Sequence, residues 1–141
     1  MKVWPVISRI LKWYKSKGLF VRPSRQLPGQ WRLFEYYTEP EGQLLNMKED
    51  QLIQDQLYWE LNFKSHGQFG QRSNLPVQFL GGSSQGTWDI SRNFIVLLQA
   101  DGAGQKEEIQ FAVVNGNLRL LKKDRSGRIE FFGFFRKINT I

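Results

Sequence analysis

From Gly29 onward, the sequence consists of short apolar and aromatic runs separated by turn-forming residues. The clearest run is 57–65, where every second residue is apolar. Successive side chains of an extended strand point to opposite faces of a sheet, so this alternation predicts a strand with one face on a core and the other in water. The apolar side of the run consists of Leu57, Trp59, Leu61 and Phe63.

Turn signals separate the runs at short intervals. Asn115-Gly116 lies between two alternating runs, 108–114 and 117–122. Both residues tolerate the positive φ angles of a type I′ turn, which joins neighbouring antiparallel strands through two residues. Further clusters of Gly, Ser, Asn, Asp and other turn-forming residues occur at 65–67, 81–84, 91–93, 101–104 and 124–127. Together these signals predict an antiparallel up-and-down meander.

The strands can be placed coarsely along the whole of this region. They are expected at 29–38, 43–48, 57–65, 68–73, 76–80, 85–91, 94–100, 107–114, 117–123 and 128–138. A flat meander of this length would expose both of its edges, and closing the sheet removes them. We therefore predict an all-β fold, an up-and-down antiparallel β-barrel of about eight strands.

The same alternation assigns inward-facing side chains on the other strands. These are Trp88, Ile90, Ile109, Phe111, Val113, Leu118, Leu120, Ile129, Phe131 and Phe135. An eight-stranded barrel can be filled by such side chains or can hold one small ligand, and the sequence leaves both possibilities open.

A cavity with this lining would accept a small hydrophobic molecule, because the inward positions offer aromatic and aliphatic area. Glu35 and Tyr37 alternate with Trp31 and Leu33, so they are the polar groups expected to orient the ligand. The predicted ligand-binding residues are Tyr37, Trp59, Leu61, Phe63, Trp88, Phe111, Leu120 and Phe131. The alternative is a side-chain-filled barrel that serves as a protein-interaction or membrane-peripheral module through its N-terminal segment.

Positive charge is concentrated in that N-terminal segment. Residues 1–34 contain eight basic and no acidic residues, whereas the remaining chain contains 12 basic and 13 acidic ones. On a helix of 3.6 residues per turn, residues 3–16 place their apolar side chains on one half and Arg9, Lys12 and Lys15 on the other. We predict a basic amphipathic α-helix and a linker over 1–28, followed by the barrel over 29–141.

Two partners are possible for the apolar half of this helix. The first is the outside of the barrel, because Phe132 and Phe134 fall on the face opposite Phe131 and Phe135 and should be covered. The second is an anionic membrane surface, with the basic half of the helix toward the lipid headgroups. No small-residue cleavage site follows the apolar run at 3–11, so we expect a retained N-terminus and favour a cytoplasmic or membrane-peripheral location.

Three segments of the chain resemble the lipocalin-like (calycin) domains of the small bacterial type. Pro28-Gly29-Gln30-Trp31 matches the G-x-W that opens the first strand of the family, and Phe134-Phe135-Arg136-Lys137 ends the last strand with basic residues. Gly86-Thr87-Trp88-Asp89-Ile90, which runs into a tight turn, is similar as well. The resemblance covers residues 28–138. It implies that Trp31 closes one end of the barrel and that Arg136 packs across its indole ring.

Catalytic and metal-binding groups are scarce. The chain has no cysteine, and its one histidine, His66, falls in a predicted turn. Glu107 and Glu108 are adjacent on a predicted strand, so their carboxylates point to opposite faces and do not form an acid–base pair. We therefore expect no enzyme, no bound metal and no cofactor. Nucleic acid is an unlikely partner, because the basic residues that lie among aromatics are confined to the N-terminal segment and the barrel is nearly neutral.

Overall fold

Most of the described residues form one antiparallel sheet that closes on itself. The computed structural model describes residues 23–81, 83–99 and 106–138. Its elements are α2 (Pro23–Gln26), β1 (Gly29–Thr38), a 3-10 turn η1 (Pro40–Gly42), β2 (Leu45–Met47), α3 (Glu49–Gln54), β3 (Trp59–Phe63), β4 (Gln68–Ser73), β5 (Gln85–Ser91), β6 (Phe94–Gln99), β7 (Lys106–Val114), β8 (Asn117–Lys123) and β9 (Ile129–Lys137).

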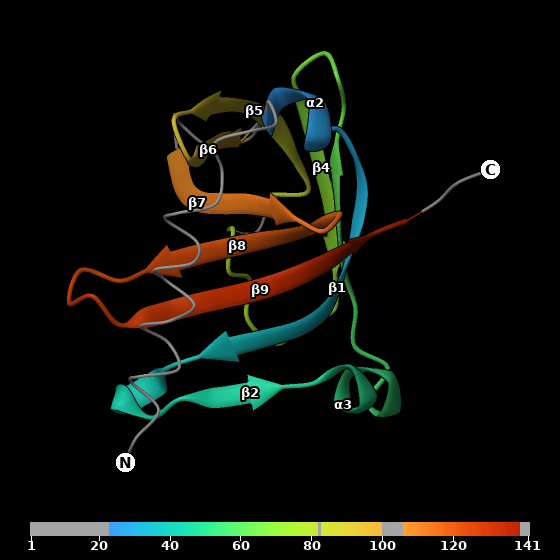
Figure 1. Cartoon of the computed structure of the whole chain (residues 1–141). Helices are drawn as coiled ribbons and strands as arrows, with labels where there is room; N and C mark the ends of the chain where they lie inside the picture. Colours follow the sequence, from blue (N-terminus) through green and yellow to red (C-terminus); the bar gives the residue numbers. More distant parts are fainter. Residues whose placement is uncertain (1–22, 82, 100–105, 139–141) are drawn as a thin grey trace.

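The pairing of β1 with β9 closes the barrel. In the described residues the sheet has the order β2-β1-β3-β4-β5-β6-β7-β8-β9, and β1 also pairs with β9. Eight antiparallel strands, β1 and β3 to β9, thus form an up-and-down barrel (Figure 1). The predicted barrel is confirmed, with β2 as one additional strand. The predicted N-terminal helix lies in residues 1–22, outside the described residues.

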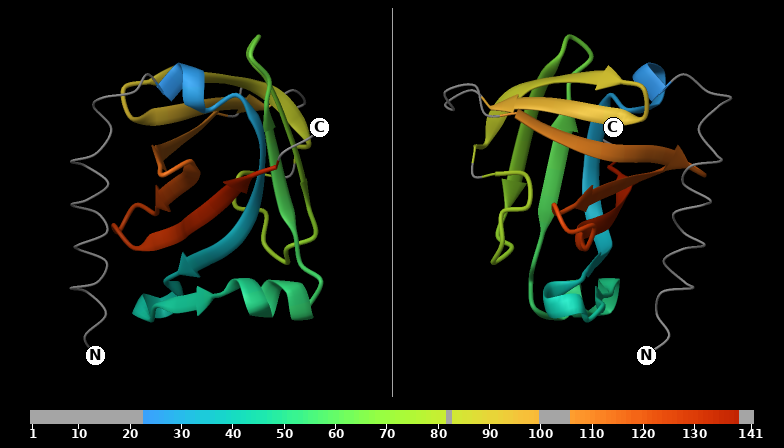
Figure 2. Two further views of the ribbon diagram at one scale, coloured as in Figure 1. Left: turned by 45° about the vertical axis from the view of Figure 1, so that its right-hand side comes forward. Right: turned by 90° about the vertical axis from the view of Figure 1, so that its left-hand side faces the viewer.

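The two ends of the barrel carry different elements. α2 lies at the end where β1 begins, whereas β2 and α3 lie at the end where β1 finishes (Figure 2). β3 pairs with the first half of β1, at residues 29–32. β2 pairs with residues 36–38 of β1, on the same edge beyond the end of the β3 pairing.

A β-bulge in β1 decides which of its side chains face the interior. The pairing with β9 shifts register between Leu33 and Glu35. Trp31 and Leu33 are buried before the shift, and Tyr36 is buried after it. One extra residue in a strand moves every residue beyond it to the other face. The expected inward orientation of Glu35 and Tyr37 is therefore wrong, and Tyr36 takes that place.

A second register shift, between Lys122 and Lys123 of β8, has the same consequence for β9. Ile129 was expected to face inward together with Phe131. It packs instead with Phe132 in a separate buried cluster. The assignment of Ile129 is wrong because the shift lies between it and Phe131.

The main cluster of buried side chains lies in the barrel interior. Its buried members include nine of the side chains assigned inward from the sequence, Trp59, Leu61, Phe63, Ile109, Phe111, Leu118, Leu120, Phe131 and Phe135. Leu57, Trp88, Ile90 and Val113 are half-buried and pack against this cluster. Alternation therefore located most of the core.

The turn between β7 and β8 has the predicted geometry. Asn115 has φ of 52° and Gly116 has φ of 80°, so both adopt the positive φ angles that a type I′ turn requires. The β8–β9 turn is fixed by Asp124, whose Oδ1 accepts hydrogen bonds from the backbone N–H of Ser126 at 2.9 Å and of Arg128 at 3.0 Å. The hydrogen bond from the Ser126 side chain, together with these backbone bonds, lowers the pKa of Asp124.

Three segments differ from the sequence prediction. Residues 76–80, expected to form a strand, belong to the β4–β5 loop, because they pack against the core without pairing in the sheet. α3 was not predicted, although Glu49 and Asp50 in its first turn and the buried Leu52 are helix signals. α2 occupies part of the expected linker.

We predict that Gly116→Ala lowers the free energy of unfolding by about 1–2 kcal/mol, because its φ lies in the left-handed region. No heavy atom lies within 4 Å of the Cβ it would gain, so the cost is conformational. Gly70→Ala is the matched control. Its φ is outside that region and its added Cβ would meet Ser84 O at an ordinary 3.7 Å, so it should be neutral or stabilising. Urea denaturation measures both, and equal losses would contradict the argument.

Candidate binding site in the barrel

Aromatic rings converge on one point in the interior. The Trp59 ring lies 5.0 Å from that of Phe131 and 5.3 Å from that of Phe135, between ring centroids. Tyr36 lies 5.9 Å from Phe131. These side chains come from β1, β3 and β9, so three strands hold them in place.

Phe79 occupies the centre of this group, and it comes from a loop. Its ring stacks on Phe131 at 4.7 Å and contacts Tyr36 at 5.9 Å and Trp59 at 6.1 Å. Leu75 and Leu80 of the same β4–β5 loop are also buried in the core. The loop therefore inserts apolar side chains into the end of the barrel opposite α2. We call Tyr36, Trp59 and Phe131 the aromatic cage.

Side chains of the barrel hold the backbone of this loop. Lys122 Nζ donates to the carbonyl of Phe79 at 3.1 Å, and Gln99 Nε2 donates to the carbonyl of Leu80 at 3.1 Å. At Phe79 and Leu80 the attachment thus uses individual hydrogen bonds from side chains. The ends of the loop are held by backbone bonds, from Asn74 N to Tyr58 O at 3.1 Å and from Gln71 N to Ser84 O at 2.9 Å.

Gln71 connects the loop to the aromatic cage. Its Nε2 donates to the carbonyl of Ser83 at 2.8 Å, while its Oε1 accepts from Trp59 Nε1 at 3.0 Å. The indole N–H of a buried tryptophan needs such a partner. One amide therefore orients a cage ring and holds the loop.

A charged pair lies at the same end of the barrel. Lys122 Nζ is 3.0 Å from a carboxylate oxygen of Glu107, and the side chains are 18% and 26% exposed. Glu130 lies 3.7 Å away from the same ammonium group. Glu108 has a different partner, Lys106 at 3.5 Å. The adjacent carboxylates of β7 thus take separate partners.

The opposite end is closed around Trp31. Its side chain is buried, and its Nε1 donates to the carbonyl of Leu27 at 2.8 Å. The cation over its ring is Lys137, whose Nζ lies 5.2 Å from the ring centroid. The role expected for Arg136 is therefore taken by Lys137, because Lys137 is the residue that pairs with Trp31 across β1 and β9.

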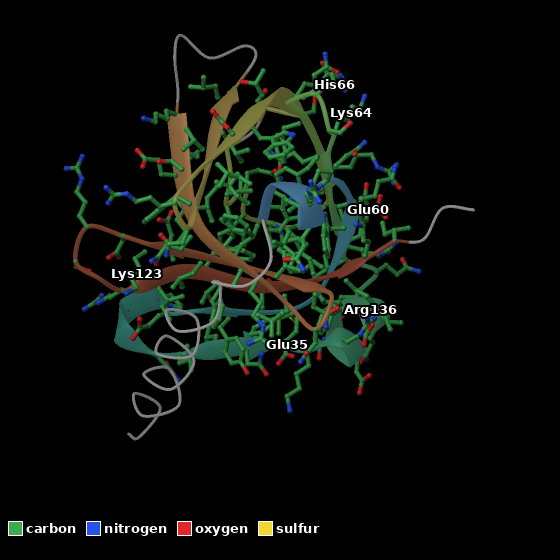
Figure 3. All side chains as sticks on the ribbon, turned by 45° about the horizontal axis from the view of Figure 1, so that its top comes forward. Glu35, Glu60, Lys64, His66, Lys123 and Arg136 are labelled. Carbon is green, nitrogen blue, oxygen red and sulfur yellow. The ribbon has the colours of Figure 1, made fainter. Side chains whose placement is uncertain are left out.

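Arg136 lies on the outside instead (Figure 3). Its guanidinium is 4.3 Å from the centroid of the Phe34 ring and 2.9 Å from Glu49 of α3. Successive side chains of a strand point to opposite faces, and Arg136 directly precedes Lys137 on β9. The side chain of Arg136 therefore lies on the outer surface, whereas that of Lys137 lies at the end of the barrel.

Most of the predicted ligand-binding residues meet in the interior. Trp59, Leu61, Phe63, Phe111, Leu120 and Phe131 are buried there, and the half-buried Trp88 contacts Phe63 at 5.7 Å. The sequence analysis missed Tyr36, Leu75, Phe79 and Leu80. The loop residues carried a usable signal, since a short apolar run with Pro76 near its start and Gly81-Gly82 after it suits an inserted loop better than a strand.

Tyr37 is the one predicted site residue outside the interior. Its ring lies 6.3 Å from Phe132 and 6.0 Å from Phe134, both on the outer face. Burial, followed by the charge of Glu35 and a hydrogen bond with it, raises the pKa of Tyr37. In the interior, burial raises the pKa of Tyr36.

The outer face around Tyr37 carries a second apolar cluster, which we call the outer cluster. It consists of the buried Ala112, Leu121, Ile129 and Phe132, with Tyr37, Leu44, Val114 and Phe134 packed against them. The guanidinium of Arg119 lies 4.9 Å from the centroid of the Phe134 ring, and burial lowers the pKa of Arg119. Apolar side chains are thus buried on both faces of β9.

The one histidine of the chain belongs to no group of metal-binding side chains in the described part of the structure. His66 is exposed in the β3–β4 turn (Figure 3). Within residues 23–81, 83–99 and 106–138, no group of three or more His, Cys, Asp and Glu side chains has the geometry to hold a metal ion. No helix in the same ranges combines the length and apolar character needed to cross a membrane.

The sequence was also compared with known proteins. No protein-family model matches it, and no curated protein matches it.

We predict that Lys122→Met loosens the β4–β5 loop, because it removes the hydrogen bond to the Phe79 carbonyl and leaves Glu107 without its cation. Loss of a bond of this kind costs about 1–3 kcal/mol. Hydrogen exchange of the backbone amides of Leu75 and of residues 77–81 should become faster. Lys123→Met, at the exposed neighbouring residue (Figure 3), is the control and should leave this exchange unchanged. Unchanged exchange in Lys122→Met would contradict the proposed attachment.

Proposed function

We propose that this protein is a non-catalytic binder of a small hydrophobic molecule, which occupies the place where Phe79 now lies. One observation carries the proposal: the aromatic cage is built by three strands, but the ring inside it belongs to a loop. A rigid cage with a removable occupant has the properties of a binding site. Phe79 then acts as an internal competitor of the ligand.

The energetics of Phe79 set the affinity. Burying one phenylalanine side chain stabilises a protein by about 1.5–3 kcal/mol, and a ligand must replace that contact. The affinity observed is the intrinsic affinity reduced by the fraction of molecules whose loop is open. A ligand therefore needs an apolar group at least as large as a phenyl ring, so that it can pack on Phe131 and contact Trp59.

Lys122 suggests one polar feature of the ligand. Its ammonium group donates to the Phe79 carbonyl in the closed loop, so departure of the loop frees that donor. A ligand with a carbonyl or carboxylate at one end would replace the lost acceptor. The ligand we propose is thus aromatic or aliphatic along most of its length, with one acceptor at the end near Lys122.

The resemblance to lipocalin-like domains supports this proposal. Trp31 is buried at one end beneath a basic residue of the last strand, and the β4–β5 loop covers the other end. This arrangement fits a barrel that admits its ligand from the loop end. We propose that the chain is a small lipocalin-like domain on these grounds.

A second candidate function follows from how well the interior is filled. With Phe79 stacked on Phe131 at 4.7 Å, the cage has an occupant without any ligand. In this alternative the loop never opens, and the barrel is a rigid support for interactions made by its N-terminal segment with a protein or an anionic membrane. Arg9, Lys12 and Lys15 would provide the basic surface.

We predict that Phe79→Ala increases the affinity for hydrophobic ligands by about tenfold or more, because it removes the competitor. Quenching of tryptophan fluorescence by oleate, retinol and protoporphyrin provides the measurement, since Trp59 lies in the cage. The variant should also lose about 3–5 kcal/mol of stability, and saturating ligand should restore part of it. Phe79→Val, a milder truncation, covers the case in which the alanine variant does not fold.

Val77→Ala is the matched control in the same loop. Val77 is 53% exposed, so its truncation should change neither stability nor affinity. Saturable quenching in Phe79→Ala or Phe79→Val that exceeds that of wild type supports the ligand site. No saturable quenching by any of the three probes in any variant would reject it in favour of the filled barrel.

We further propose that residues 3–16 form the amphipathic helix predicted from the sequence and cover the outer cluster. The support is that Leu121 and Phe132 belong to an apolar cluster on the face that points away from the barrel interior, where apolar side chains need a cover. The segment precedes α2 directly and has the required apolar half. A helix of 14 residues is about 21 Å long, comparable to a strand of six or seven residues.

Deletion of residues 1–18 tests this assignment. If the helix packs on the outer cluster, the shortened protein should be less stable and should aggregate, because the phenylalanines of β9 become exposed. If the helix binds membranes, the shortened protein should remain monomeric and lose only its affinity for anionic vesicles. The full-length triple variant Arg9→Gln, Lys12→Gln, Lys15→Gln is the control, and it should affect vesicle binding alone. A deletion that stays monomeric and equally stable would contradict packing.

A further inference from the structure

A groove of about 870 Å³ lies on the side of the barrel formed by β3, β4 and β5. Eight of its 17 lining residues carry an amide or a hydroxyl group, namely Gln30, Asn62, Gln68, Gln71, Ser84, Gln85, Thr87 and Gln99. The others include three charged residues and the apolar Leu61, Phe69, Leu98 and Ile138. The aromatic cage residues do not line it. Leu61 and Gln71 line the groove and also belong to the interior, so the groove lies beside the interior site but does not include the cage.

Strand pairing arranges part of this lining in a row across four strands. Gln30 of β1 pairs with Asn62 of β3, Asn62 pairs with Gly70 of β4, and Gly70 pairs with Gln85 of β5. We call these four residues the amide row. With strands about 4.8 Å apart, the row spans about 14 Å. Three amide side chains, with a gap at Gly70, thus cross the floor of the groove.

Neither the backbone conformation nor the neighbouring atoms in the described residues require a glycine at position 70. Its φ lies outside the left-handed region, and an added Cβ would meet only Ser84 O, at an ordinary 3.7 Å. Gly86 differs, because a Cβ there would collide with the carbonyl of Leu98. Glycine in a strand interior often marks a bulge, a bend at a barrel corner, or a close approach of another backbone or a ligand. The pairings of β4 show no register shift at Gly70, and the nearest backbone atom lies at an ordinary distance. Gly70 therefore points to an occupant of the groove.

Charged residues lie at the two margins of the row. On one side, Glu60 pairs with both Arg32 and Arg72. On the other side, Lys64 follows β3, and Figure 3 shows Glu60 and Lys64 on the same side of the molecule. The amide row itself carries no charge. Each amide offers both donors and acceptors, a combination that suits hydroxyl groups, which also donate and accept.

We propose that the groove binds a short neutral oligosaccharide, which lies across the amide row with its closest approach over Gly70. Hydroxyl groups of the sugar exchange hydrogen bonds with Gln30, Asn62 and Gln85. The lack of a side chain at Gly70 lets a sugar ring reach the floor of the groove. β5 pairs only with Gln68–Gly70 of β4, so an extended peptide that pairs with the rest of β4 is the alternative that the competing probe tests; the amide row lies within that pairing and favours the sugar.

Nuclear magnetic resonance titration of the full-length, isotope-labelled protein tests the proposal. The probes are maltohexaose, cellohexaose, xylohexaose and chitohexaose, each raised to about 10 mM, a range that detects affinities near 1 mM. At least one should give saturable shifts of the side-chain amide signals of Gln30, Asn62 and Gln85 and of the backbone signal of Gly70. A peptide of Gly-Ser-Asn repeats is the competing probe.

Three variants make the test specific. Gly70→Val places a branched side chain in the gap and should fold at least as stably as wild type, because valine favours strands. It should weaken binding about tenfold or more. Asn62→Ala removes one amide of the row and should weaken binding as well, which keeps the test valid if Gly70→Val does not fold. Asn46→Ala, an amide of β2 outside the groove, should bind like wild type.

No saturable shift with any of the four sugars would overturn the proposal. So would wild-type affinity in both Gly70→Val and Asn62→Ala, or shifts caused by the peptide and by none of the sugars. Oleate and retinol titrations of Gly70→Val should match those of wild type, so a failure of the groove proposal is distinguishable from a failure of the interior site.

Discussion

The pairing of β1 with β9 is the contact on which the rest of the structure depends. It joins residues 95 to 106 positions apart, from Tyr37 with Phe132 to Trp31 with Lys137, and converts an open meander into a barrel. The same seam brings Lys137 over the buried Trp31. Its register shift turns Tyr36 inward and leaves Tyr37 to the outer cluster. The bulge in β1 therefore decides which residues of the second half of this strand face the interior and which face the outer cluster.

The architecture can be predicted from the sequence because its signals are local. Alternation at 57–65 and the turn at Asn115-Gly116 depend on neighbouring residues, and both are confirmed. A bulge leaves no comparable signal, since Phe34 is neither glycine nor proline and fits a regular strand as well as an irregular one. The wrong assignments of Tyr37 and Ile129 to the interior both result from such register shifts.

The candidate site was predictable only in part, for a related reason. Strand positions such as Trp59 and Phe131 obey the alternation, so the wall of the site could be found. The occupant of the cage, the side chain of Phe79, could not be found in this way, because the position of a loop depends on contacts between residues distant in sequence. Phe79 meets Tyr36 and Phe131, which lie in the first and last strands of the barrel. The sequence of the loop indicates that it is not a strand, but it does not indicate which strands Phe79 contacts.

The closing seam also has a consequence for how the chain reaches this fold. The contacts from β3 to β9 join strands that are neighbours in sequence, so they can form while the chain is being synthesised. The seam cannot form until Lys137 has left the ribosome. Until then the growing sheet presents β1 as one open edge and its newest strand as the other. The stage at which this protein is most exposed to edge-to-edge aggregation is therefore the interval before its last strand arrives.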